Sequence, residues 1–145
     1  MKKLLFTLMV CGGAFALCAA DLNWMTDLPA AQKKAKADNK LVFMNFTGSD
    51  WCGWCKKMDA DVFSKKEFKE YADKKLVMVF VDFPRKPLAA EQKQANEALK
   101  SKYEIKGYPT LIVLDAQGEV VHKNVGYQGD VQKWIKTLDA AKKSH

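Results

Sequence analysis

The stretch TGSDWCGWCKKMD, residues 47–59, lies between two patterns that are typical of different secondary structures. The apolar run over residues 41–46 predicts a buried strand. Beyond the stretch, Cys55 and Met58 begin a series of apolar residues at helical spacing. We therefore expect Cys52 and its partner cysteine to lie where a buried strand gives way to a helix.

The rest of the chain can be divided into strands and helices by the same reasoning. The first predicted helix has Trp24, Leu28, Ala31 and Ala35 on one face and Asp27 as its cap. After the cysteines we predict a short helix that follows a Ser64 to Glu67 capping box, a strand over 76–83 and a helix from 88 to about 103. The chain then forms a hairpin of strands 110–114 and 120–125 and a last helix over 131–138 capped by Asp130. The order αβαβαββα predicts an α/β domain with a central mixed sheet and helices on both faces.

The N-terminus is typical of a secretory signal peptide, because two lysines precede an uncharged, mostly apolar run over residues 4–20. Cleavage is predicted after Ala20, which leaves a single domain over 21–145 in the periplasm or outside the cell. Lipidation is disfavoured because no small residue comes directly before Cys11 or Cys18. An uncleaved membrane anchor stays open as an alternative.

The charge of the chain does not indicate a nucleic-acid partner. The sequence has 24 Lys and Arg against 17 Asp and Glu, a net charge of +7 that falls by two with the leader. These lysines alternate with acidic residues along the predicted helices, a pattern typical of a solvated surface. Because the leader also removes two of the four cysteines, a disulfide-stapled scaffold is excluded, and the remaining pair needs its own explanation.

Several motifs of the domain resemble the thioredoxin superfamily. They are the WCGWC run at 51–55 after a predicted strand, the GYPT run at 107–110 before a hairpin, and the terminal amphipathic helix. The longer GSDWCGWC run and the VDFP at 81–84 resemble exported thiol:disulfide oxidoreductases of the chlamydial DsbH type and, more loosely, the C-terminal domain of DsbD. The resemblance covers the domain over 21–145 and implies a thioredoxin fold.

The cysteine pair suits thiol–disulfide exchange. A thiol attacks a disulfide as the thiolate, and the N-terminus of a helix stabilises negative charge. Cys52 is therefore the predicted nucleophile, and Cys55, one turn later and deeper, is the predicted resolving thiol. The cycle ends in a Cys52–Cys55 disulfide, and no other cofactor is expected.

Five further residues are predicted to contact substrate. Gly53 leaves room beside the reacting sulfur. Trp51 resembles the tryptophan that flanks the cysteine pair in most thioredoxins, where it either packs against the fold or contacts substrate. Trp54 either forms an apolar ledge for substrate or packs over the helix, and both interpretations stay open. By resemblance, Pro109 follows a cis peptide bond, and the backbone of Tyr108 pairs with an extended substrate.

One departure from the thioredoxin pattern concerns the proton of the resolving cysteine. Thioredoxins commonly bury an aspartate under the dithiol and pair it with a lysine, but the matching residues here are Asn45 and Met78. Neither side chain can take up a proton. The proton is expected to leave through water, or towards Asp50, Lys56 or Lys57 if one of them approaches.

Other uses of the pair are less well supported. A zinc site needs four ligands, and only His122 and His145 could add to the two cysteines. An inert clasp would constrain the unfolded chain little, because its loop is short. A peptide-binding or chaperone module without turnover is the alternative that we carry forward; its binding would survive mutation of Cys52.

Within redox chemistry, the sequence favours a reductase or isomerase over an oxidase, because the dipeptide between the cysteines lacks the histidine of many strong oxidants. The expected partners are exported proteins that contain disulfides and an upstream membrane or periplasmic thiol partner. No metal and no nucleic acid are expected, and the domain is predicted to be a monomer.

Overall fold

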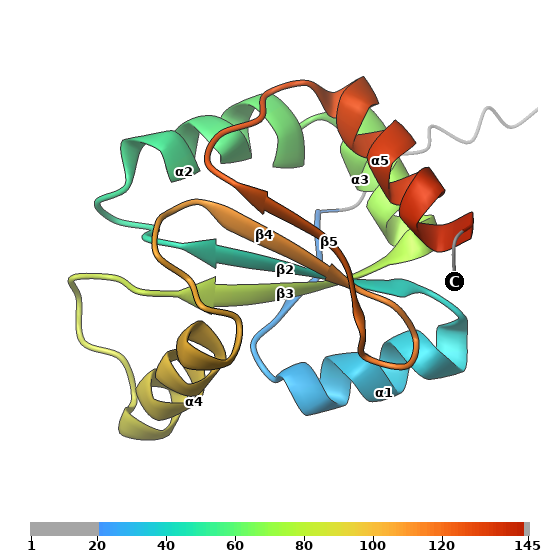
Figure 1. The fold of residues 1–145 in the computed structure, drawn as a ribbon. Coiled ribbons are helices and arrows are strands. Elements are labelled where there is room, and N and C mark those ends of the chain that lie inside the picture. Colours follow the sequence, from blue (N-terminus) through green and yellow to red (C-terminus); the bar gives the residue numbers. More distant parts are fainter. Residues whose placement is uncertain (1–20, 144–145) are drawn as a thin grey trace, which may run out of the picture.

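A mixed β-sheet lies at the centre of the computed structural model, which describes residues 21–143 (Figure 1). In that range the strands are β1 (Trp24–Met25), β2 (Leu41–Thr47), β3 (Leu76–Asp82), β4 (Thr110–Leu114) and β5 (Val120–Val125). Their order across the sheet is β1-β3-β2-β4-β5. β1, β3 and β2 run parallel, whereas β4 is antiparallel to both β2 and β5, which confirms the predicted hairpin. The predicted signal peptide lies outside the described residues.

Helices cover both faces of the sheet. They are α1 (Leu28–Asp38), α2 (Gly53–Met58), α3 (Lys66–Lys75), α4 (Ala90–Lys102) and α5 (Val131–Lys143), and a π-helical turn, η1 (Asp59–Phe63), continues α2. α1 and α4 lie on one face, and α2, α3 and α5 lie on the other (Figure 1). This arrangement confirms the predicted α/β class. None of the helices within 21–143 is long and apolar enough to cross a membrane.

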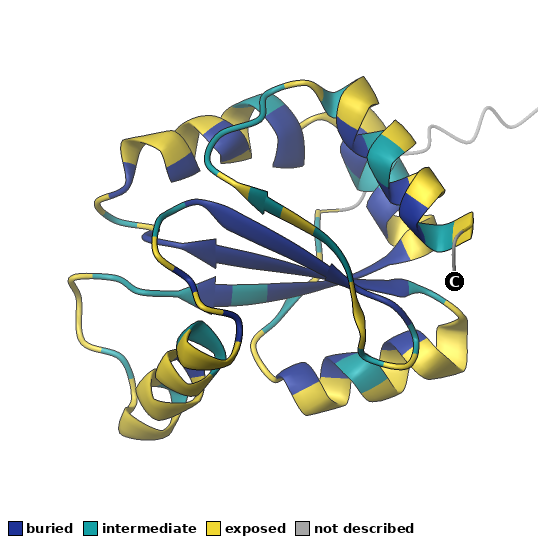
Figure 2. Ribbon diagram, in the orientation of Figure 1, coloured by how far each residue is buried: buried dark blue, intermediate teal, exposed yellow. Residues whose placement is uncertain are grey.

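β2 is buried along its whole length, because helices cover it on both sides (Figure 2). Alternate side chains enter two separate cores: Val42 and Met44 pack with residues of α1, and Phe43 packs with residues of α2, α3 and α5. Asn45 follows the same alternation as Phe43, so it lies on the face that α2 covers. This register brings a polar side chain beneath the helix that carries the cysteines.

Two of the predicted helix caps are confirmed. Asp27 Oδ1 accepts a hydrogen bond from the Ala30 N–H at 2.9 Å, and Asp130 Oδ1 accepts one from the Lys133 N–H at 3.0 Å. Each bond pairs a donor that the first turn of a helix leaves free, which is worth about 1 kcal/mol.

The N-terminal segment differs from the prediction at Trp24, which lies in β1 and not on a helix. Asp27 and Pro29 place the start of α1 after this residue, because proline is tolerated only in the first turn. Trp24 instead pairs with Met78 along the free edge of β3. The edge strand could not be predicted from helical spacing, because its partner lies far along the chain.

The predicted capping box at Ser64 is wrong. The Ser64 N–H donates to the Asp59 carbonyl at 2.8 Å, so this residue ends η1. α3 begins at Lys66, and among the described residues no side chain caps its first turn. The π-helical turn extends α2 as far as Ser64, the residue that the capping-box motif predicted as the cap of the next helix.

The connection between β3 and α4 is longer than predicted. β3 ends at Asp82, one residue before the expected end of the strand at 83. α4 begins at Ala90, two residues after the expected start of the helix at 88. Pro84 and Pro87 lie between them, and proline removes a backbone donor and disfavours helical geometry in the preceding residue. The result is a loop that lies close to the cysteine pair.

Candidate active site

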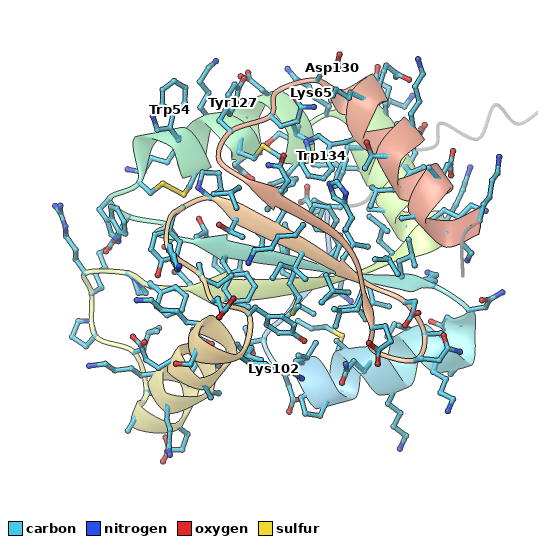
Figure 3. All side chains as sticks on the ribbon, in the orientation of Figure 1. Trp54, Lys65, Lys102, Tyr127, Asp130 and Trp134 are labelled. Atoms are coloured by element: carbon cyan, nitrogen blue, oxygen red, sulfur yellow. A yellow bond between two sulfur atoms is a disulfide. The ribbon has the colours of Figure 1, made fainter. Side chains whose placement is uncertain are left out.

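The two cysteines form a disulfide at the start of α2, with their Cα atoms 5.2 Å apart; the sulfur–sulfur bond is visible in Figure 3. Cys52 is the N-cap residue, and its Sγ accepts a hydrogen bond from the Cys55 N–H at 3.2 Å. Both residues are 6% exposed. The prediction that Cys55 is the deeper of the two is therefore wrong, because the two residues are equally buried.

Two aspartates tie the loop before the first cysteine to the end of β3 and to the loop that follows it. Ser49 donates to Asp82 through its N–H at 2.9 Å and its hydroxyl at 2.6 Å. Asp50 accepts hydrogen bonds from the backbone N–H groups of Arg85 and Lys86 at 3.0 and 3.1 Å. The bond from the Arg85 backbone holds the pKa of the Asp50 carboxyl below its usual value. Asp50 is thus engaged away from the dithiol.

Trp51 packs on the same loop while keeping part of its ring in solvent. Its Nε1 donates to the Phe83 carbonyl at 2.7 Å, and its ring meets Tyr108 edge to face at a centroid distance of 5.7 Å. The ring centroids of Phe83 and Tyr108 lie 5.3 Å apart. Gly48 is required beneath this cluster, because a Cβ there would overlap the Trp51 ring. The structure therefore places Trp51 and Tyr108 together, as predicted for one site.

Pro109 follows a cis peptide bond, as the family resemblance predicted. The residue is buried, and its carbonyl accepts a hydrogen bond from the Gly126 N–H at 2.8 Å. The Thr110 hydroxyl closes the turn by donating to the Gly107 carbonyl at 2.7 Å. These bonds join the turn before β4 to the loop after β5.

Trp54 projects from α2 with 60% of its surface exposed, and one ring neighbour supports it. Tyr127 lies at a centroid distance of 5.4 Å, with the planes tilted by 37° (Figure 3). The Tyr127 hydroxyl donates to Asp61, which raises the pKa of the tyrosine. Lys57 pairs with Asp61 at 2.7 Å and lies 5.2 Å from the centre of the Tyr127 ring. We call Trp54 and Tyr127 the aromatic pair.

Tyr127 was missed by sequence reasoning. It belongs to the loop between β5 and α5, and no motif or periodicity marks that loop as part of the site. Its neighbours Gly126 and Gly129 indicate a turn but not what the turn contacts. The contact with Trp54 joins residues more than seventy positions apart, which a local pattern cannot reveal.

A cavity of about 350 Å³ lies behind the second cysteine. Its polar lining includes Asn45, Cys55, Lys56 and Asp59, and aromatic rings form another part of its wall. Asn45 is 5% exposed, and its Oδ1 has no hydrogen-bond partner among residues 21–143. Met78 lies elsewhere, opposite Phe43 in the core, and Phe80 is the residue that pairs with Asn45.

The residues considered for a zinc site that the structure describes, the two cysteines and His122, do not form a metal-binding group. His122 lies on β5 and makes an edge contact with Trp134 at 5.9 Å, and burial lowers its pKa. His145 lies outside the described residues. The described part of the chain holds no group of three or more His, Cys, Asp or Glu that could bind a metal ion.

Comparisons with known proteins identify relatives that are named as disulfide oxidoreductases. A family model described as a thioredoxin-like domain matches residues 28–142. The disulfide bond reductase DsbH of Chlamydia pneumoniae is 42% identical over 104 residues, which are 71% of this chain and 62% of that protein. Protein disulfide-isomerase 1 of Dictyostelium discoideum is 33% identical over 79% of this chain and 29% of its own length. The chain thus spans about three fifths or less of these curated relatives.

Solved structures agree with these matches. The DsbH oxidoreductase superimposes with a TM-score of 0.80 and 34% identity, covering 100% of this chain and 96% of that one. The oxidised C-terminal domain of Neisseria meningitidis DsbD, at 21% identity, covers 82% of this chain and 99% of its own with a TM-score of 0.61. The latter likeness shows the fold alone. The relatives are disulfide oxidoreductases. A disulfide between two cysteines spaced like Cys52 and Cys55 can be reduced and formed again by thiol–disulfide exchange.

Proposed function

This chain belongs to the thioredoxin-like family, and we propose that it is an exported protein-disulfide oxidoreductase that reduces or isomerises disulfides in exported proteins. The observation that carries the proposal is the Cys52–Cys55 disulfide at the junction of β2 and α2. A clasp of this size adds little stability, whereas the position at a helix N-terminus favours a reactive thiolate. The proposal predicts that replacing Cys52 by serine abolishes catalysis of disulfide reduction.

The proposed cycle conserves atoms and electrons. The Cys52 thiolate attacks one sulfur of the substrate disulfide, which forms a mixed disulfide and releases the other substrate sulfur as a thiolate. Cys55 then loses its proton and attacks Cys52 Sγ, which releases the second substrate sulfur. Two electrons pass from the protein dithiol to the substrate, and the substrate thiolates take up two protons. An upstream thiol partner would reduce the Cys52–Cys55 bond again.

The places of the two cysteines, one before α2 and one within it, support the proposed roles. Cys52 precedes the first turn, where free backbone N–H groups and the helix dipole stabilise an anion, and the Cys55 N–H already points at its sulfur. Gly53 supports substrate access. Among the described residues a Cβ at Gly53 would meet nothing within 4 Å, so the fold itself does not require glycine there. A bound substrate gives a reason for its small size.

We assign the aromatic pair to substrate binding. Trp54 follows the nucleophile by two residues, is largely exposed, and is held on one side by Tyr127. Tyr127 is in turn held by Asp61 and Lys57. A supported but exposed aromatic ring offers apolar area at a low cost in side-chain entropy. We infer that it receives an apolar side chain next to the substrate cysteine, while Trp51, Tyr108 and Pro109 contact the substrate backbone.

Replacing Trp54 by alanine is expected to lower kcat/KM for a peptide disulfide with apolar flanking residues by about tenfold, or about 1.4 kcal/mol. The loss should be smaller for glutathione disulfide, because that substrate has no apolar flank. Val120→Ala serves as a matched control, since Val120 is 48% exposed and lies at the far end of β5. Equal losses of kcat/KM on both substrates would rule out Trp54 as an apolar ledge for substrate.

The direction of the reaction is proposed to be reduction. Strong oxidants stabilise their reduced form, and Trp54 brings no positive charge to the dipeptide to do so. We expect a glutathione titration of the Cys52–Cys55 couple to give a potential near that of thioredoxin, about −270 mV, and far from that of DsbA, about −120 mV. A value near the DsbA potential would make the protein an oxidase.

The place of action and the partners are part of the same proposal. The apolar run over residues 4–20 supports export and cleavage near Ala20, which would leave the domain in the periplasm or outside the cell. Disulfides persist in such compartments, so exported proteins are the expected substrates. A reductase there needs a thiol donor of its own, and we propose a membrane or periplasmic redox protein for that role. The domain is proposed to act as a monomer.

A further inference from the structure

The cavity behind Cys55 has a composition suited to moving a proton. Among the described residues that line it, the ionisable ones are Cys55, Lys56 and Asp59; the others, Asn45 included, carry no charge at neutral pH. A volume of about 350 Å³ is more than enough for water molecules, and the lining offers polar partners for them. The second thiol of the proposed cycle therefore borders a polar space and not sealed apolar core.

Asn45 cannot serve as the acceptor, although it lies beneath the dithiol. Its amide donates and accepts hydrogen bonds but takes up no proton at neutral pH. Its buried Oδ1 has no partner among residues 21–143, so the residue keeps hydrogen-bonding capacity at the wall of the cavity. Asn45 is suited to orient water, and the base must come from another side chain.

Most of the carboxylates and lysines near Cys55 already take part in hydrogen bonds or ion pairs. Asp50 accepts hydrogen bonds from the 85–86 backbone, and Asp61 is bound by Lys57 and a tyrosine hydroxyl. Lys56 lines the cavity, but a protonated ammonium cannot accept a proton, and its Nζ donates to the Asp50 carbonyl at 3.1 Å. These contacts disfavour Asp50, Lys56 and Lys57, the three side chains that the sequence analysis considered as acceptors.

Asp59 is placed differently. Its backbone N–H donates to the Cys55 carbonyl, so it lies one turn after the resolving cysteine, at the start of η1. It lines the same cavity as Cys55, and the residue as a whole is exposed to solvent. A carboxylate in this position can receive a proton from inside the cavity and return it to bulk solvent.

We propose that Asp59 accepts, through water in the cavity, the proton that Cys55 loses when it resolves the mixed disulfide. The Cys55 S–H bond breaks, its electron pair forms the bond to Cys52 Sγ, and the bond from Cys52 to the substrate sulfur breaks. The departing substrate thiolate takes a proton from solvent, and Asp59 gives its proton to solvent. This inference rests on the proposed exchange reaction and concerns its second step.

Stopped-flow mixing of the reduced protein with a chromogenic nitrobenzoate disulfide separates the two steps. Attack by Cys52 releases one coloured thiolate, and resolution by Cys55 releases the second. In Asp59→Asn we expect an unchanged first phase and a second phase about tenfold slower at pH 7, since a positioned base contributes roughly 10²–10⁴-fold and water remains as a weaker acceptor. The absence of a first phase in the wild type would reject the proposed function, whereas a fast second phase in Asp59→Asn would reject only this inference.

Two further measurements separate proton transfer from a structural role. At pH 9, above the usual thiol pKa of about 8.5, the variant and the wild type should resolve at similar rates, because solvent removes the proton. In the double variant Asn45→Asp with Asp59→Asn, a carboxylate again lines the cavity, and the second phase at pH 7 should recover.

The matched control is Asp73→Asn, which removes an exposed carboxylate on α3 away from the cavity and should leave both phases unchanged. A second phase in Asp59→Asn that stays equally slow at pH 9 would overturn the proposal. Failure of the double variant to recover, with its stability to urea intact, would overturn it as well.

Discussion

Replacing Cys52 by serine is expected to abolish catalysis of insulin reduction in the presence of dithiothreitol, so that insulin precipitates at the uncatalysed rate. Serine has nearly the same shape and keeps the cap position on α2, but its hydroxyl is not ionised at neutral pH and cannot form a mixed disulfide. The loss therefore reports the missing nucleophile. Turbidity measured over time, with protein at catalytic concentration, gives the rate.

Cys55→Ala is the matched variant for this experiment. It keeps the attacking thiol and removes the resolving one, so the mixed disulfide should accumulate and be visible by mass spectrometry as an adduct on Cys52. The same variant should trap the physiological partners. Unchanged turnover in Cys52→Ser would contradict the catalytic role of the pair. Peptide binding without turnover in the wild type would favour the redox-inactive binding module.

Replacing Phe43 by alanine is expected to lower the free energy of unfolding by about 3–5 kcal/mol, a large part of the stability of a domain this size. Phe43 is 0% exposed, and its ring meets those of Phe63, Phe68 and Trp134 at centroid distances of 5.7 to 5.9 Å. Truncation would leave a cavity where the central strand meets the helices of one face. Urea denaturation of the oxidised protein, followed by far-UV circular dichroism, measures the change.

Val120→Ala provides the comparison for Phe43→Ala. Val120 is 48% exposed on β5, so its truncation should change the free energy of unfolding by no more than about 0.5 kcal/mol. A loss below about 1 kcal/mol in Phe43→Ala would show that the aromatic cluster does not hold the sheet and the helices together as described.

The order of the long elements and the location of the cysteine pair could be predicted because both depend on local patterns. The buried run over 41–46, the helical spacing after Cys55 and the caps at Asp27 and Asp130 each involve residues within a few positions of one another. The cis bond before Pro109 was predicted by family resemblance only, since proline bonds are ordinarily trans.

The local patterns failed where a partner outside the predicted motif decided the outcome. Trp24 fits a helical face but forms a strand, because the edge of β3 was available to it. Ser64 fits a capping box but closes the π-helical turn. Asp50 was considered as a proton acceptor, yet the backbone at Arg85 holds its carboxylate. In each case a hydrogen bond with a partner outside the predicted motif determined the local structure.

Local patterns were enough to predict that a buried strand leads into a helix with Cys52 at its start, because periodicity and capping act within one or two turns of the chain. What surrounds the pair depends on how the distant segments of the domain pack together. This packing brought Tyr127 to Trp54, and it opened a cavity that Asn45, Cys55 and Asp59 share. These neighbours come from segments that only the packing of β2, α2 and the loop after β5 brings together, and side-chain periodicity reports burial but not which buried or exposed groups meet.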